Sequence, residues 1–173
     1  MRFYRVMRRS FLTMGLVLLA LQSAPAMASG AASGPDASVV LEVTSAGQDS
    51  QKIVFDMASL RAIGTTEIVT STIWTDGEHR FLGVSLHDLL THIGAEGRAI
   101  EATAINDYAI KIPMSDATQD GPIVAFEMDG APMPRRTKGP LWIVYPFDSS
   151  AQFRTEAIYA RSIWQLNRLY IVK

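Results

Sequence analysis

A strand and a helix meet in residues 81–94, which read FLGVSLHDLLTHIG. The apolar positions of the second half are spaced i, i+3, i+4 and i+7, which places them on one face of a helix: Leu86, Leu89, Leu90 and Ile93. Ser85 stands where a side chain accepts the first free helical N–H groups, and Gly94 is a helix stop. The stretch predicts a return strand over residues 80–84 that runs directly into a helix over residues 86–93.

Short strands are expected on both sides of this unit. Residues 66–75 are rich in β-branched side chains and precede a turn at Asp76-Gly77, while Asp56 is placed to cap a helix over residues 57–63. Further strands are expected at 39–44, 52–55, 100–105, 108–112, 123–128, 141–145 (a central strand) and 163–172, with helical turns within 114–118 and 153–161. The expected strands and helices do not alternate as βαβ units. The pattern therefore indicates an α+β domain with mixed or antiparallel sheets and two or three short helices.

The first 28 residues have the features of a secretory signal peptide. Four arginines precede an apolar run over residues 11–21, and Ala26-Met27-Ala28 is an A-x-A cleavage site. We expect a signal peptide at 1–28, a flexible tether at 29–38, a domain at 39–173, and a periplasmic or secreted protein. Arg8-Arg9 followed by Ser-Phe-Leu also resembles the twin-arginine pattern, so the general and twin-arginine export routes both stay open. An uncleaved anchor is the weaker alternative, because a spanning helix needs about 20 apolar residues.

Charge and cysteine content exclude several classes of function. Removing the four arginines of the leader from the 16 basic residues leaves 12 against 17 acidic ones, a net charge of about −5. Such a protein has no electrostatic attraction for nucleic acid, so we expect no nucleic-acid partner. The chain contains no cysteine, which excludes disulfides, thiolate metal sites and a cysteine nucleophile.

Two segments carry the candidate ligand-binding residues. Arg135, Arg136 and Lys138 form the densest basic cluster in an acidic chain, and guanidinium groups match the geometry of phosphate, sulfate or carboxylate. The alternative is a solvated loop. Asn106, Asp107 and Tyr108 lie at the junction of two strands, where they make either a hairpin turn or the edge of a pocket.

The remaining polar residues give weaker signals. His87 and His92 are five residues apart on one short helix, whereas metal-binding pairs prefer i, i+4, and His79 adjoins a turn. Ser85, His87 and Asp88 contain the residue types of a catalytic triad, but neighbours on one helix cannot adopt its geometry. We therefore assign no catalytic residue and no metal ligand. The three tryptophans, Trp142 among them, are expected in the core or in a pocket wall.

Five phrases of the sequence occur in the order found in the molybdopterin-binding domain of the sulfite-oxidase superfamily. They are residues 81–94, 106–113, 123–133, 138–146 and 162–172. The chain resembles this family over residues 81–173, with a weaker likeness back to residue 40. It is most similar to the short exported members described as molybdopterin-dependent oxidoreductases, which implies a reduced sulfite-oxidase-type fold.

The resemblance also implies a cofactor and site residues. It implies molybdopterin, a tyrosine facing the metal centre at Tyr108, and a pocket-lining loop at Arg135, Arg136 and Lys138. The family binds molybdenum through one cysteine thiolate, at a position near residues 70–72 of this chain, where Thr-Ser-Thr stands. Members usually have arginine at the position of Trp142. A hydroxyl is a hard, weakly acidic donor and does not replace a soft thiolate.

Three functions follow as hypotheses. The first is a periplasmic accessory module that binds a small anion or pterin-like ligand near Asn106, Asp107, Tyr108, Arg135, Arg136, Lys138 and Trp142. The second is a molybdopterin oxidoreductase whose metal is held only by the pterin dithiolene. The third is a docking protein for a periplasmic or membrane-bound sensor or redox subunit. Fold does not choose among them.

Overall fold

The computed structural model describes residues 38–45 and 51–173, which belong to one compact unit, Ser33–Lys173. The expected signal peptide and all of the expected tether except Ser38 lie outside the described residues. The elements, in chain order, are β1 (Leu41–Ser45), β2 (Lys52–Phe55), α1 (Met57–Ile63), β3 (Thr66–Ser71), β4 (Glu78–Ser85), α2 (Leu86–His92), β5 (Ala99–Ala104), β6 (Ala109–Pro113), η1 (Met114–Asp116), β7 (Ile123–Met128), β8 (Ala131–Pro132), β9 (Trp142–Val144), η2 (Ala151–Phe153), α3 (Glu156–Arg161) and β10 (Leu166–Val172).

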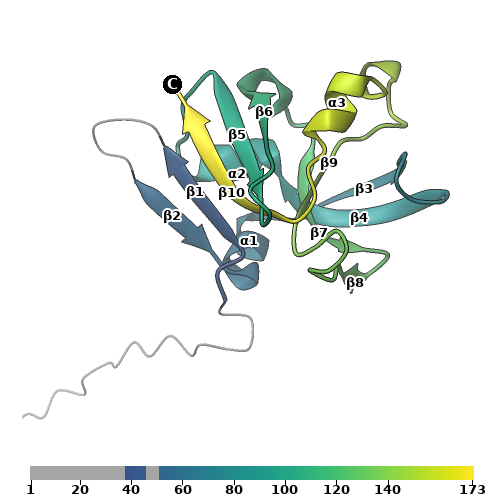
Figure 1. Cartoon of the computed structure of the whole chain (residues 1–173), viewed down its shortest axis with the longest axis horizontal. Coiled ribbons are helices and arrows are strands. Elements are labelled where there is room, and N and C mark those ends of the chain that lie inside the picture. Colours follow the sequence, from purple (N-terminus) through teal and green to yellow (C-terminus); the bar gives the residue numbers. More distant parts are fainter. Residues whose placement is uncertain (1–37, 46–50) are drawn as a thin grey trace, which may run out of the picture. The chain divides into compact units, whose positions relative to one another are not determined.

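The strands form two five-stranded sheets (Figure 1). The first has the order β2-β1-β10-β5-β6, and the second has the order β3-β4-β7-β8 with β9 also paired to β7. The pairing of β1 with β10 is parallel and the other ladders are antiparallel. This mixed α+β architecture confirms the predicted fold class.

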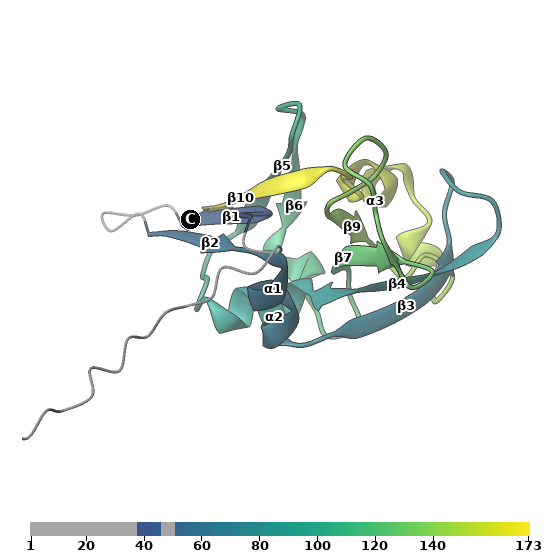
Figure 2. The same ribbon diagram turned by 90° about the horizontal axis from the view of Figure 1, so that it is seen from below.

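Side-chain caps define where the first two helices begin. Asp56 and Ser59 form a reciprocal capping box on α1, in which the Asp56 carboxylate accepts from the Ser59 N–H at 2.7 Å. Ser85 Oγ accepts from Asp88 N on α2, whose Leu86, Leu89 and Leu90 are buried as the spacing predicts. The two helices contact each other and β4, and Figure 2 shows them side by side on one face of the first sheet.

The core of the second sheet depends on a close approach between β4 and β7. The register shifts between Leu82 and Gly83, so Gly83 lies against the backbone of Val124 and Ala125. A Cβ atom on Gly83 would come within 2.6 Å of Ala125 Cα and closer still to the Val124 carbonyl oxygen. The neighbouring Phe81 and Val84 are fully buried. Glycine is therefore required here by contact with a neighbouring strand.

Three expected strands are shorter in the structure than in the sequence pattern. The strand expected at 66–75 ends at Ser71, because the Thr72 hydroxyl accepts from Trp74 N and turns the chain. The strand expected at 141–145 is the three-residue β9, which pairs with β7 and makes one isolated bridge to Trp164. It is fully buried, but it is not a central strand. The strand expected at 163–172 begins at Leu166, since Gln165 has a φ of 51°.

None of the helices in residues 38–45 and 51–173 has the length and apolar character needed to cross a membrane.

Replacing Gly83 with alanine is expected to destabilise the fold by about 1–3 kcal/mol, the usual range for overpacking, because two backbone segments must separate to admit the methyl group. Urea denaturation measures this loss. Val69→Ala is the control on the neighbouring β3, where the side chain is 52% exposed and the expected change is below about 1 kcal/mol. An unchanged unfolding midpoint for Gly83→Ala would contradict the close approach.

The stability of the β3–β4 hairpin is expected to depend on pH through His79. Its ring Nδ1 lies 2.6 Å from Asp129 Oδ2, and this hydrogen bond raises the pKa of His79 above its ordinary value of 6.5. The same bond lowers the pKa of Asp129 below 3.8. A raised histidine pKa contributes stability that is complete below 6.5 and is lost as pH rises through the folded-state pKa. The carboxylate contribution is lost in acid, as pH falls through the lowered pKa of Asp129.

Urea denaturation between pH 4.5 and 9 tests this expectation. The wild type should lose stability above neutrality relative to His79→Gln. Asp129→Asn should flatten the same part of the profile, because the imidazolium then lacks its partner. Parallel profiles for the wild type and both variants would show that the pair is not coupled to folding.

Candidate functional site

A cluster of aromatic rings surrounds Trp74. This residue lies in the loop between β3 and β4 and meets four rings edge-on, of which the nearest are Trp164 at 5.5 Å between centroids, Trp142 at 5.9 Å and Tyr159 at 5.9 Å. Phe147 lies 6.3 Å away. Edge-to-face pairs at such distances are favourable beyond the apolar area that they bury. The cluster thereby joins the β3–β4 loop to β9, to α3 and to the segment before β10.

Local hydrogen bonds hold the loop in the conformation that delivers Trp74. The hydroxyl groups of Thr72 and Thr75 lie 2.7 Å apart, and Thr72 Oγ1 also accepts from the Trp74 N–H at 3.1 Å. Such bonds compete with the ladder hydrogen bonds of a strand. They account for the early end of β3 and for the inward position of the indole.

A cavity of about 390 Å³ opens beside this cluster. Its wall is mainly apolar, includes four aromatic side chains and contains no carboxylate. It is lined by Trp74, Ala104, Asn106, Tyr108, Tyr159, Ala160, Ser162, Ile163 and Trp164. Three segments meet here: the β3–β4 loop, the β5–β6 turn, and α3 with the chain that follows it. The volume falls in the range of about 300–1,000 Å³ that is typical of small-molecule pockets.

The structure separates the three predicted residues of the β5–β6 turn. Asn106 and Tyr108 line the cavity, and Asn106 Oδ1 accepts from the Tyr108 N–H. Asp107 has a φ of 65°, and its carboxylate forms an ion pair with Arg168 at 2.5 Å. Asp107 and Arg168 border a different hollow, on β1, β5 and β10. The asparagine and the tyrosine therefore belong to the aromatic cavity, whereas the aspartate faces the first sheet.

The predicted basic cluster forms an arm before β9, residues 134–139. Pro134 O accepts from the N–H groups of Thr137 and Gly139, and a Cβ on Gly139 would collide with Met133. Gln165 fixes the arm to the segment before β10, because its side-chain amide donates to Arg135 O at 2.7 Å and its backbone N–H donates to Lys138 O at 3.0 Å.

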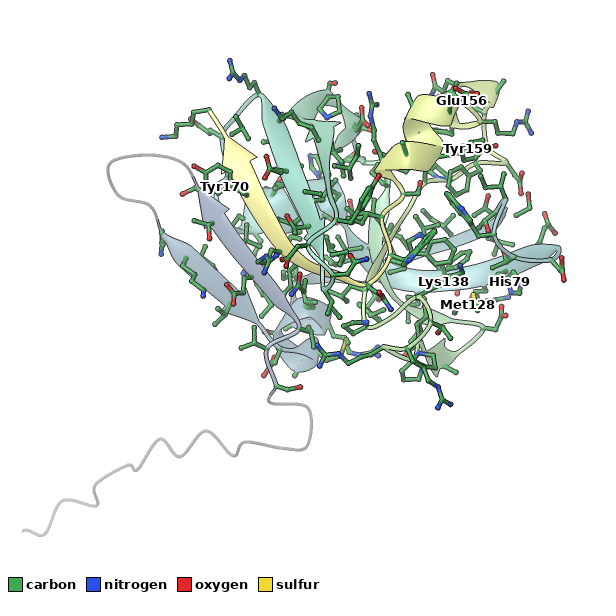
Figure 3. All side chains as sticks on the ribbon, in the orientation of Figure 1. His79, Met128, Lys138, Glu156, Tyr159 and Tyr170 are labelled. Carbon is green, nitrogen blue, oxygen red and sulfur yellow. The ribbon has the colours of Figure 1, made fainter. Side chains whose placement is uncertain are left out.

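The Lys138 ammonium lies over two tryptophan rings. Its Nζ is 4.6 Å from the centroid of Trp164, which lines the cavity, and 5.0 Å from that of Trp142. Figure 3 labels Lys138 on this arm and Tyr159 on α3. Desolvation by burial lowers the pKa of Lys138 below its ordinary value. Arg135 and Arg136 are exposed on the same arm, and none of the three basic residues is among those that line the cavity.

Trp142 lies beneath the cavity and outside its lining. It is fully buried, its indole N–H donates to Ser162 O at 3.0 Å, and its ring packs edge-on against Phe81 at 5.4 Å. Its ring also packs edge-on against Trp74 and Trp164, two residues of the cavity wall.

Tyr159 is the functional residue that sequence reasoning missed. It stands in α3, where only a partly helical segment was expected, and no spacing in the sequence relates it to Trp74. The tryptophans were expected in a core or a pocket wall, which agrees with where Trp74 and Trp164 lie.

A polar network outside the cavity joins Asp116, Tyr145 and Arg161. Asp116 Oδ2 accepts from Tyr145 Oη at 2.7 Å and from Arg161 at 2.9 Å. Burial and this hydrogen bond raise the pKa of Tyr145 far above its ordinary value. The network ties α3 to η1 and to the end of β9. Among residues 38–45 and 51–173, no group of three or more metal-ligating side chains is placed to hold a metal ion.

The segment at residues 70–72 does not fit a thiolate-held metal. Thr70 is fully buried, and its hydroxyl accepts from Asp148 N at 3.1 Å. Ser71 donates through both its backbone N–H and its hydroxyl to the Asp148 carboxylate, and these bonds lower the pKa of Asp148. Hydroxyl groups engaged in this way are poor ligands for a metal that prefers soft sulfur.

Comparison with known proteins identifies the family. Residues 35–152 match the family described as oxidoreductase molybdopterin binding domain. Among solved structures, the chain is similar to the sulfane dehydrogenase SoxCD from Paracoccus pantotrophus, with 18% sequence identity and a TM-score of 0.55. The match covers 76% of this chain and 38% of that chain, so it shows a shared fold over part of the larger protein. No curated protein sequence matches. The chain belongs to the oxidoreductase molybdopterin-binding domain family, with the fold of the sulfite-oxidase type.

Proposed function

We propose that this protein is an exported accessory module that retains the family fold and binds a small anionic ligand in the aromatic cavity, without molybdenum chemistry of its own. The observation that carries the proposal is the position of Lys138, whose ammonium lies over a ring of a cavity with no carboxylate in its wall. The hydroxyl groups of Thr70 and Ser71 are already hydrogen-bonded to Asp148, which supports a role in recognition over a role in metal binding.

The electrostatic surroundings favour a negative ligand. Within the described ranges, Arg135, Arg136 and Lys138 form no ion pair, whereas Arg61 and Arg161 are paired to carboxylates. With the ring of Trp164 between them, a ligand in van der Waals contact with the ring would lie about 8 Å from the ammonium, which is 4.6 Å from the ring centroid. At that distance two unit charges attract by about 0.5 kcal/mol in water and about 2 kcal/mol at an effective dielectric constant of 20. Removing the charge of Lys138 is therefore expected to weaken the binding of an anion by about 2- to 30-fold.

A partner-docking role is a second candidate. Two aromatic side chains of the cavity wall are exposed, Tyr108 by 52% and Trp164 by 37%, and Ile105, next to Asn106 in the chain, is 38% exposed. Aromatic residues beside arginine are enriched at protein interfaces. Co-purification after crosslinking in the native host distinguishes this role, since a ligand-binding module acting alone would leave the chain uncrosslinked.

Binding of small anions is the direct test of the proposal. A ligand at 100 times its Kd stabilises the folded state by about 2.7 kcal/mol, which raises the Tm of a domain of this size by roughly 5–10 °C. A thermal-shift panel of sulfate, phosphate, acetate, benzoate and a pterin should contain at least one stabilising anion. Lys138→Met should weaken its binding by about 2- to 30-fold.

The controls separate a local effect from one of net charge. Lys52→Met removes the same charge from β2, at the opposite edge of the first sheet from β6, and should leave affinity unchanged. Arg135→Ala with Arg136→Ala should reduce affinity mainly at low salt, because exposed charges are screened. The absence of any stabilising anion, or equal loss in the two lysine variants, would refute the proposal.

Family membership favours the alternative of a genuine molybdopterin oxidoreductase. Metal and pterin analysis of protein purified from its native host separates the two. We expect both at background level, because the chain has no cysteine and the hydroxyls at residues 70–72 are engaged. Molybdenum and pterin at one equivalent per chain would establish the oxidoreductase and remove the proposed function.

A further inference from the structure

We infer that the ligand of the aromatic cavity is a flat, unsaturated ring system with an oxyanion at one end, the chemistry of a bicyclic aromatic carboxylate. This inference rests on the proposed function and specifies the ligand class. It comes from the arrangement of three of the four rings that line the cavity, those of Trp74, Tyr159 and Trp164, and from the position of Lys138.

Three rings that line the cavity differ strongly in orientation. Trp164 makes an angle of 78° with Trp74, and Tyr159 makes an angle of 87° with it. Both therefore stand nearly perpendicular to Trp74, and all three line the same space. A planar ring placed there can stack on an upright ring and meet the edge of another, which are the favoured aromatic geometries. A puckered aliphatic ring of similar size cannot make these contacts.

The cavity is held open by packing that needs no ligand. Trp74 is supported by Trp142 and Phe147, and its loop is fixed by the hydroxyl groups of Thr72 and Thr75. Trp142 is anchored in turn by its hydrogen bond to Ser162 O. Rings that are already ordered lose little freedom on binding, so more of the stacking energy appears as affinity.

The polar groups of the wall fix the direction of the ligand. Asn106 Oδ1 accepts from the Tyr108 N–H, which leaves the amide nitrogen to donate. The Ser162 hydroxyl donates to Ile158 O and is occupied. Lys138 is not itself a lining residue, but its ammonium lies over the ring of Trp164, which is one. An oxyanion is expected toward the lysine and ring acceptor atoms toward Asn106.

Three probes of matched size separate the parts of this inference: 2-naphthoate, decahydro-2-naphthoate and 2-naphthalenemethanol. The second has the charge without the flat ring, and the third has the ring without the charge. Titration calorimetry on the full chain should give 2-naphthoate a higher affinity than either of the others, by about 2- to 30-fold over the alcohol, which lacks the charge. Tyr159→Leu should reduce this preference for the flat probe, and Tyr159→Phe should retain it.

Each outcome has a distinct meaning. Equal affinity for the two carboxylates would overturn the flat-ring inference and leave the anion-binding function standing. Equal affinity for 2-naphthoate and the alcohol would overturn the anionic end and, with it, the proposed function. Binding of none of the probes, together with no stabilising anion in the thermal-shift panel, would overturn both. If Tyr159→Leu does not fold, Tyr108→Leu at the exposed mouth makes the same comparison.

Discussion

The edge-on packing of Trp74 against Trp142 is the contact on which the site depends. Trp74 comes from the loop after β3, Trp142 begins β9, and Trp164 precedes β10, so three segments distant in sequence meet through their rings. Each ring buries a large apolar surface, and their geometry is specific. Without Trp74 the cavity would lose one wall, and Lys138 would lie over a ring with less support. Two side chains of the cavity wall, Trp74 and Trp164, are therefore held in place by packing against the buried Trp142.

The family fold is kept while the chemistry at one segment differs. The strands and helices agree with the sulfite-oxidase type, yet Thr70 and Ser71 are hydrogen-bonded to Asp148, near the position where the resemblance implies a thiolate. These bonds satisfy a buried hydroxyl and the end of an edge strand, so the segment has a structural role of its own. A likeness in fold therefore supports a pocket in this place more strongly than it supports a reaction.

Local signals predicted the elements and left the site incomplete. The ends of α1 and α2 followed from Asp56, Ser85 and the leucine spacing, because caps and periodicity act over a few residues. The end of β3 at Ser71 did not, since a threonine side chain and a partly buried tryptophan outweigh β propensity there. Asn106 and Tyr108 were placed correctly at a turn, but Tyr159 was missed. Its partnership with Trp74 exists only after α3 has packed, and no sequence spacing encodes such a contact.

The parallel pairing of β1 with β10 has a consequence for how the chain folds. β10 lies between β1 and β5, so the first sheet is joined by contacts such as that of Glu42 with Arg168, from opposite ends of the described chain. Contacts between distant residues require an entropically costly loop closure and slow the folding reaction. Until β10 pairs with β1, the apolar side chains of Leu41, Val43 and Phe55, which are buried in the finished fold, remain exposed to solvent. A slow closure lengthens the time for which these apolar side chains can contact other chains, and so favours aggregation during production.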